Sequence, residues 1–210
     1  MKIDTFILGD FQTNCYCLRI SESETDCLLI DAGLDAQSLV DFLKQNKLKP
    51  VTLILTHGHI DHIAGVNLLR HNFPDITIVI HSDDANMLSS PAKNLSIATG
   101  QIFKTGPADI IIQNEGPAEF GPFTFDVLQT PGHTPGGICL YSAENKLAFV
   151  GDTLFAGSIG RTDFPGASFD GLMNSIKTKL LAFPDDTTIY TGHGPATTIA
   201  REKQSNPFLQ

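Results

Sequence analysis

The sequence VTLILTHGHIDH, residues 51–62, joins a continuous apolar run to a cluster of metal-binding side chains. Residues 51–55 are apolar or β-branched throughout, a pattern typical of a central strand buried in a parallel sheet. The loop that follows carries His57, His59, Asp61 and His62. Loops at the carboxyl end of a buried strand are held rigidly yet reach solvent, so they often carry functional side chains. Capping of the next helix would explain Asp61 alone but not three histidines, so this loop predicts a metal site.

Three further residues of metal-binding type follow other predicted strands. His133 lies in TPGHTPGG, Asp152 lies in VGDT and His193 lies in TGHGP, each within a turn of small residues. Any one of them alone would more often be a surface or capping residue, but the same order of strand, turn and ligand is repeated. Five histidines and two aspartates suit a binuclear site, and this donor set favours Zn²⁺ or else Fe or Mn.

Outward from these motifs, the chain alternates strands and helices. Apolar and β-branched runs predict strands at residues 3–8, 15–20, 27–30, 76–80, 123–128, 137–141, 146–150 and 187–191. Helical spacing predicts helices at 35–47, 64–71 and 168–183, with Asp35 and Ser168 as caps of the first and last, and a short helix after Pro195. Residues 82–121 have the weakest pattern and predict loops with short elements. No linker or repeat divides the chain, so we expect one domain over residues 1–210, with two sheets packed between helical layers.

Composition excludes several classes of partner. The 14 Lys+Arg are scattered along the chain and are outnumbered by 23 Asp+Glu, which gives a net charge of −9. No nucleic-acid partner is therefore expected. No apolar run approaches the roughly 20 residues that span a bilayer, and the first residues lack the apolar region of a signal peptide. We therefore expect a cytoplasmic protein that does not bind membranes.

The four cysteines lack Cys-x-x-Cys spacing and are expected to be reduced thiols. No pattern specifies an oligomeric state.

Taken together, THGHIDH, the Asp31 of LIDAG, PGHTPGG, GDTLF and TGHGP resemble the motifs of the metallo-β-lactamase-fold hydrolases, and most closely their small glyoxalase II-like branch. The resemblance implies an α/β fold, a four-layer αββα sandwich with a dinuclear metal site at one edge. It implies a first metal bound by His57, His59 and His133, a second bound by Asp61, His62 and His193, and Asp152 bridging the two. Asp31 matches a position that supports the ligands rather than coordinating metal.

This resemblance implies a metal-dependent hydrolase. A water that bridges two divalent cations loses a proton near neutral pH, and the metals polarise the scissile carbonyl. Zn²⁺ also suits a thiolate leaving group, which needs little proton donation. We therefore expect a hydroxyacylglutathione hydrolase-like thioesterase that cleaves small-molecule thioesters such as S-lactoylglutathione through a bridging hydroxide, with Asp61 and Asp152 as its catalytic carboxylates. Full-length glyoxalase II-like enzymes add a C-terminal helical domain that contacts glutathione, and because 17 residues follow His193 in this sequence, we expect no such domain here.

Three other functions fit the same motifs less well. GRTDFPG, with Arg161 and Asp163, is shared with the persulfide dioxygenases of the superfamily, whose single iron would here be bound by His57, His133 and Asp152. The ending TGHGPATTI favours the hydrolases, and we expect Arg161 to pair with Asp163 within its loop rather than to contact substrate. β-Lactamases of this fold are usually exported and carry Cys in place of the bridging Asp. A non-catalytic metal-binding module would be expected to have lost ligands.

Overall fold

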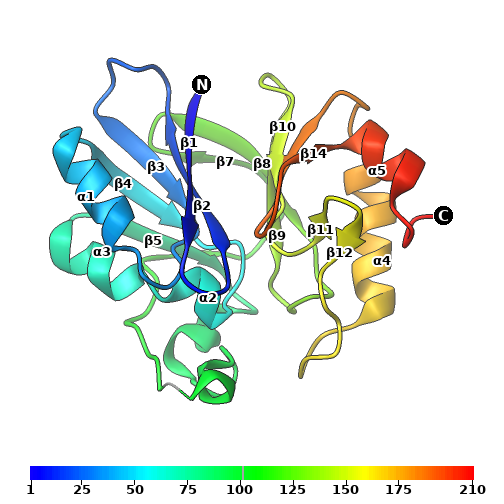
Figure 1. Cartoon of the computed structure of the whole chain (residues 1–210), viewed down its shortest axis with the longest axis horizontal. Coiled ribbons are helices and arrows are strands. Elements are labelled where there is room, and N and C mark those ends of the chain that lie inside the picture. Colours follow the sequence, from blue (N-terminus) through cyan, green and yellow to red (C-terminus); the bar gives the residue numbers. More distant parts are fainter. Residues whose placement is uncertain (101) are drawn as a thin grey trace. The chain divides into compact units, whose positions relative to one another are not determined.

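The computed structural model describes residues 1–100 and 102–210, which form two compact units of mixed α/β structure (Figure 1). Unit 1 comprises residues 1–112 and 119–123, and unit 2 comprises residues 113–118 and 124–210. Each unit has a main sheet with helices packed against it. The single domain expected over residues 1–210 stays a prediction.

Unit 1 is built on a sheet with the strand order β1-β2-β3-β4-β5-β6. Its strands are β1 (Lys2–Leu8), β2 (Thr13–Arg19), β3 (Asp26–Ile30), β4 (Lys49–Ile54), β5 (Thr77–His81) and β6 (Ile110–Ile112). Its helices are α1 (Gln37–Gln45), α2 (Ile60–Ile63) and α3 (Val66–Asn72), with 3₁₀ helices η1 (Ala85–Ser89) and η2 (Ser96–Thr99). Strands β3 to β6 pair in parallel, so their carboxyl ends share one edge. The apolar run at residues 51–55 is therefore a central strand, as predicted.

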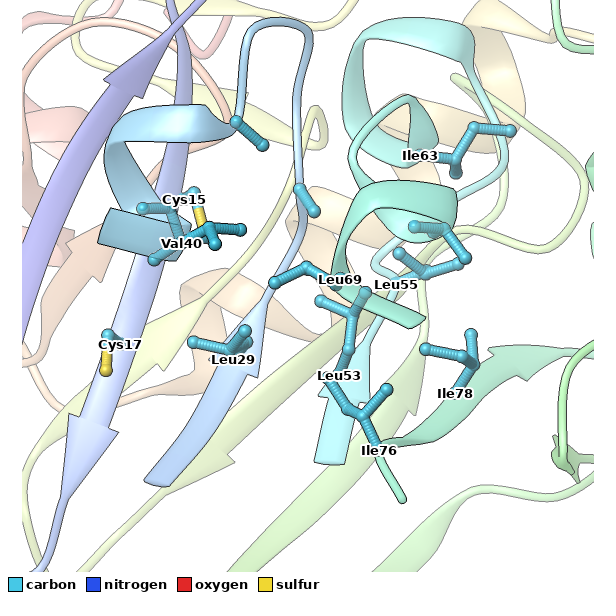
Figure 2. Close-up of a cluster of buried hydrophobic side chains, with 14 of the residues drawn as sticks. Cys15, Cys17, Leu29, Val40, Leu53, Leu55, Ile63, Leu69, Ile76 and Ile78 are labelled. Atoms are coloured by element: carbon cyan, nitrogen blue, oxygen red, sulfur yellow. The ribbon is translucent and has the colours of Figure 1, made fainter. Parts of the chain in front are cut away.

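The core of unit 1 lies between its sheet and the helices α1 and α3. Val40 of α1 and Leu69 of α3 pack with Leu29, Leu53 and Ile78 from three neighbouring strands. Figure 2 shows this cluster, in which every labelled side chain is buried. Burying a side chain of this size contributes about 1.5–3 kcal/mol, so the cluster anchors β4 and the loop that follows it.

Unit 2 is built on a sheet with the strand order β14-β13-β10-β9-β8-β7. Its strands are β7 (Gly116–Phe120), β8 (Phe123–Gln129), β9 (Ile138–Ser142), β10 (Leu147–Phe149), β13 (Thr188–Tyr190) and β14 (Thr197–Thr198), with β7 and β8 each crossing the division between the units. A separate hairpin pairs β11 (Leu154–Phe155) with β12 (Ser158–Ile159). The helices are α4 (Phe169–Thr178), the 3₁₀ helix η3 (Leu180–Ala182) and α5 (Ile199–Ser205). Leu172 and Ile176 of α4 pack on Ala148 and Ile189 of the sheet.

The helix boundaries differ from those predicted at three places. Asp35 does not cap α1, because it lies one residue before the N-cap Ala36 in a left-handed conformation (φ +55°). The helix predicted at 64–71 corresponds to α3, which begins at Val66 after Gly65, whose amide donates to the Ala32 carbonyl, and the short helix α2 at residues 60–63 was not predicted. Ser168 does cap α4, accepting the Gly171 amide at 3.1 Å, but the regular helix ends at Thr178 rather than 183.

The segment at residues 82–121 contains short elements, as predicted, and these are the 3₁₀ helices η1 and η2 and the strands β6 and β7. β7 carries a glycine and a proline, which are uncommon inside sheets but are tolerated in an edge strand such as this one. The four cysteines are buried, free thiols. No helix in the described residues combines the length and the apolar character that crossing a membrane requires.

Candidate functional site

The loop after β4 and the short helix α2 bring four predicted ligands together in unit 1. The ring centroids of His57 and His59 lie 4.9 Å apart, and those of His57 and His62 lie 4.1 Å apart. The Oδ2 atom of Asp61 lies 3.6 Å from Nε2 of His62. All three histidines are buried. The extended backbone of His59 followed by the turn of α2 places Asp61 and His62 beside the alternating pair, so the four side chains form one group.

Asp31 orients this group from the end of β3. Its Oδ2 accepts hydrogen bonds from Nδ1 of His62 and from Oγ1 of Thr56, both at 2.8 Å, and its Oδ1 accepts the Thr56 amide at 2.8 Å. Because Nδ1 of His62 donates its proton to this buried carboxylate, Nε2 is the atom that offers a lone pair to a metal. Asp31 thus makes the supporting contact that the resemblance implied.

Thr56 extends the same arrangement to His57, and sequence reasoning missed it. The single hydroxyl proton of Thr56 is donated to Asp31, so its Oγ1 accepts from Nδ1 of His57 at 3.1 Å. This hydrogen bond fixes the tautomer of the His57 ring, so that His57, like His62, offers Nε2 to a metal. The available signal was a hydroxyl residue directly before the first histidine of THGHIDH.

Unit 2 brings the other three predicted ligands together. Asp152 follows β10 and His193 follows β13, and these two strands pair in parallel, so both residues lie at the same sheet edge. The Oδ2 atom of Asp152 lies 3.5 Å from Nε2 of His193 and 3.5 Å from Nε2 of His133. Nδ1 of His133 donates to the carbonyl of Arg161 at 2.8 Å, which again leaves Nε2 as the ligand atom.

Close backbone packing requires glycine beside two of these ligands. A Cβ on Gly132, the residue before His133, would lie 2.2 Å from the backbone nitrogen of Leu172, and its φ of +142° disfavours any other residue. A Cβ on Gly160 would lie 1.9 Å from the carbonyl oxygen of Asp152. The glycines in these loops therefore serve to bring His133 and Asp152 to their positions.

The loop after β12 adds a charged and aromatic cluster next to His133. Arg161 forms a two-pronged ion pair with Asp163, at 2.9 and 2.8 Å, as predicted. The hydrogen bonds from Arg161 lower the pKa of Asp163 below its usual value. The Arg161 guanidinium also lies 4.3 Å from the centre of the Phe164 ring, which meets the His133 ring edge to face at 5.9 Å. In the same unit, Phe155 makes a similar contact with His193 at 6.0 Å.

The donor set fits divalent transition metals. All seven predicted ligands belong to groups of His and Asp side chains that could hold a metal ion. Three of the histidines present Nε2 because Nδ1 is hydrogen bonded to a carboxylate, a hydroxyl or a carbonyl, as in established metal sites. Imidazole and carboxylate donors suit Zn²⁺, Fe and Mn better than Ca²⁺ or Mg²⁺, which prefer oxygen ligands throughout.

Comparison with known proteins places these features in a family. The model of the Metallo-beta-lactamase superfamily matches residues 8–193. The hydroxyacylglutathione hydrolase GloC of Haemophilus influenzae is 39% identical over 210 residues, which cover 100% of this chain and 98% of that protein. The crystal structure of BLEG-1 B3 metallo-beta-lactamase is 39% identical, covers 100% of both chains and has a TM-score of 0.94. TTHA1623 in a di-iron-bound form is 35% identical, covers 98% of this chain and 100% of that chain, and has a TM-score of 0.86.

These likenesses confirm the predicted fold class, an α/β fold of the metallo-β-lactamase type. They also agree with a metal-binding role for the His and Asp groups of the two units. The division of the ligands between two ions stays a prediction.

Proposed function

Because the chain belongs to the metallo-β-lactamase superfamily, a family of metallo-hydrolases, we propose that it hydrolyses thioesters of the S-lactoylglutathione type with two bound metal ions, most simply Zn²⁺. The observation that carries this proposal is the 39% identity to GloC, which extends over the whole of this chain. The related di-iron-bound structure supports two ions and keeps Fe as an alternative to Zn²⁺.

Each of the two metal ions would be bound by three ligands of its own and by one shared carboxylate. We assign His57, His59 and His133 to the first ion, Asp61, His62 and His193 to the second, and Asp152 to both. Two bound divalent ions supply a water that loses a proton near neutral pH and a Lewis acid for the scissile carbonyl. The chain itself orients the imidazole rings of ligand histidines through hydrogen bonds to Nδ1. Asp31 does so for His62, and the Arg161 carbonyl does so for His133.

The residues around the ligands would bind substrate and limit its access to water. Phe155 and Phe164 place apolar rings against His193 and His133, and we propose that they contact the acyl or thiol part of the substrate. A thiol is a good leaving group as the thiolate, so the proposal needs no dedicated proton donor on the leaving side. The proposed substrate remains a small molecule, with no role for a nucleic acid or a membrane.

A β-lactam is the competing substrate, because a relative of the same identity is described as a B3 metallo-beta-lactamase. Both substrates present a carbonyl to the same metal-assisted chemistry, so the ligand set alone does not separate them. Their leaving groups differ, since a β-lactam releases an amine nitrogen that must be protonated whereas a thioester releases a thiolate. We favour the thioester because this chain has Asp152 at the bridging position, where β-lactamases of this fold carry Cys.

The test compares substrates on the zinc-loaded protein, with Asp152→Ala and Asp126→Ala as paired variants. Asp126 is an exposed carboxylate on β8 in the same unit and is not a ligand in the proposal. We expect turnover of S-lactoylglutathione, a loss of at least about 10³-fold in Asp152→Ala because several kcal/mol of metal assistance are removed, and wild-type rates in Asp126→Ala. Circular dichroism should show that both variants are folded.

Other outcomes would replace the proposal. Full activity in Asp152→Ala would refute the ligand assignment. Turnover of a β-lactam but not of the thioester would make the chain a lactamase. Oxygen uptake by the iron-loaded protein with glutathione persulfide, without thioester turnover, would make it a dioxygenase. Tight metal binding with no turnover of any of these substrates would indicate a binding module.

A further inference from the structure

The segment after β5 holds the backbone between the first two histidines of THGHIDH. The amide of Gly58, which lies between His57 and His59, donates a hydrogen bond to Oδ2 of Asp84 at 3.0 Å. Asp84 is fully buried. A hydrogen bond from a backbone amide to a buried carboxylate is among the stronger kinds, at about 1.5–3 kcal/mol. This contact therefore fixes the peptide from which both histidines extend.

The Asp84 carboxylate accepts a hydrogen bond from this loop and does not cap the helix that Asp84 precedes. It occupies the N-cap position of η1, where an aspartate ordinarily accepts an amide of the helix it precedes. No such capping bond forms in η1, and the carboxylate instead reaches a residue 26 positions earlier in the chain. The backbone amide of Asp84 donates to the His81 carbonyl at the end of β5, so the carboxylate is anchored to the sheet that carries β4.

Two further contacts from the same segment hold the loop in place. A Cβ on Gly58 would lie 2.6 Å from Cβ and 2.7 Å from Sδ of Met87, so the loop backbone packs directly on this side chain. The Ile60 amide donates to the Asn94 carbonyl at 2.8 Å. The buried Asn94 side chain in turn donates to the carbonyl of Met87 at 3.0 Å. Asp84 and its neighbours thus surround the loop at Gly58 and at the start of α2.

We propose that Asp84 is a positioning residue for the metal centre, acting through the Gly58 amide to set the directions of His57 and His59. This inference rests on the proposed metal role of the two histidines. The two rings flank Gly58 in the chain and have centroids 4.9 Å apart, so a rotation of the Gly58 peptide would turn one ring away from the other. Residues that orient metal ligands typically contribute 10- to 100-fold to metal affinity, and we assign an effect of this size to Asp84.

The experiment measures zinc affinity of the full-length chain by competition with a chromophoric chelator. Asp84→Ala removes the acceptor, and we expect zinc affinity to fall about 10- to 100-fold. Asp84→Asn keeps a carbonyl oxygen that can accept the Gly58 amide, and we expect affinity within about threefold of wild type. The matched control is Asp109→Ala, because Asp109 also accepts a backbone amide of β5, that of Ile78 at 2.8 Å. We expect this control to lower stability without changing zinc affinity.

Each outcome decides the proposal. Zinc affinity within twofold of wild type in Asp84→Ala, an equal loss in Asp109→Ala, or no rescue by Asn would overturn it. If Asp84→Ala does not fold, hydrogen exchange at the Gly58 amide of the wild-type protein provides the test. Protection of about 100-fold or more supports the contact, and exchange at the unprotected rate overturns it. A wild-type protein that binds no zinc would refute the proposed function instead, which separates the two failures.

Discussion

Replacing Glu202 tests how α5 supports the loops of unit 2. The Glu202 side chain is fully buried, and its carboxylate accepts hydrogen bonds from three donors: Oγ1 of Thr197, the Gly157 amide and Nδ2 of Asn206. Gly157 lies between β11 and β12, and the Asn206 side chain also donates to the Ser158 carbonyl. The carboxylate therefore ties α5 to the hairpin that connects Asp152 to Arg161.

The size of the effect follows from counting these donors. Glu202→Ala leaves three donors without their acceptor, each costing about 1–3 kcal/mol when it is buried. The Gly157 amide is only partly buried and regains water, so we expect a loss of about 4 kcal/mol in the free energy of unfolding. Glu202→Gln keeps an oxygen for Gly157 and Asn206, and its amide can donate to the Thr197 hydroxyl. Only the charge is lost, so we expect a cost of about 1–2 kcal/mol.

Urea unfolding of the metal-free protein, followed by far-ultraviolet circular dichroism, measures both variants. The control is Lys203→Ala on the same helix, which removes an exposed ion pair with Asp185 and should cost less than about 1 kcal/mol. Hydrogen exchange at the Gly157 amide should accelerate in Glu202→Ala but not in the control. If Glu202→Ala costs no more than Lys203→Ala, or if Gly157 exchange is unchanged, the buried carboxylate does not hold the hairpin.

Three further predictions concern single residues. Gly160→Ala places a Cβ 1.9 Å from the Asp152 carbonyl oxygen, so we expect a loss of about 2–3 kcal/mol in urea unfolding together with weaker zinc binding; an unchanged midpoint would contradict the packing argument. Burial raises the pKa of the Cys139 thiol to about 11, and the other cysteines are also buried, so the folded protein should react with a thiol reagent at pH 8 only after unfolding, when four thiols should appear. Burial alone would raise the pKa of Glu115, but hydrogen bonds, chiefly from Lys179, outweigh it and lower the pKa below the ordinary 4.5. This carboxylate therefore stabilises the fold above about pH 4.5 and loses that effect as pH falls through its lowered pKa, and Glu115→Gln should remove that part of the acid dependence of unfolding.

Much of the candidate site was readable in the sequence because metal ligands at strand ends leave a local pattern. The run at residues 51–55 predicted a buried strand, and the structure places β4 at the centre of its sheet. Four ligands follow within six residues, so their proximity could be inferred without tertiary information, and they are His57, His59, Asp61 and His62. Ser168 was also correctly identified as a cap, because the cap and the helix it begins are neighbours in the chain.

Two of the residues that sequence reasoning missed, Asp84 and Glu202, act across long separations. Asp84 contacts Gly58 from 26 positions away, and Glu202 contacts Gly157 from 45 positions away. Neither has a neighbour in the chain that reveals its role, since an isolated Asp or Glu in a polar stretch is most often exposed. Asp35 shows the converse error, because its local pattern indicated a helix cap whereas its left-handed backbone puts it before the helix.

By itself, the sequence determined the family, the fold class and the metal-binding residue types, because periodic apolar runs and closely spaced ligands are local features. Only the tertiary structure decided which atoms those ligands present. His62 and His133 would bind a metal through Nε2 because Asp31 and the Arg161 carbonyl take the Nδ1 protons, and both partners lie about 30 residues from the histidine they orient. Such contacts depend on which strand ends the sheets bring together, and pairing between distant strands is set by the packing of the whole core rather than by any short stretch of the chain.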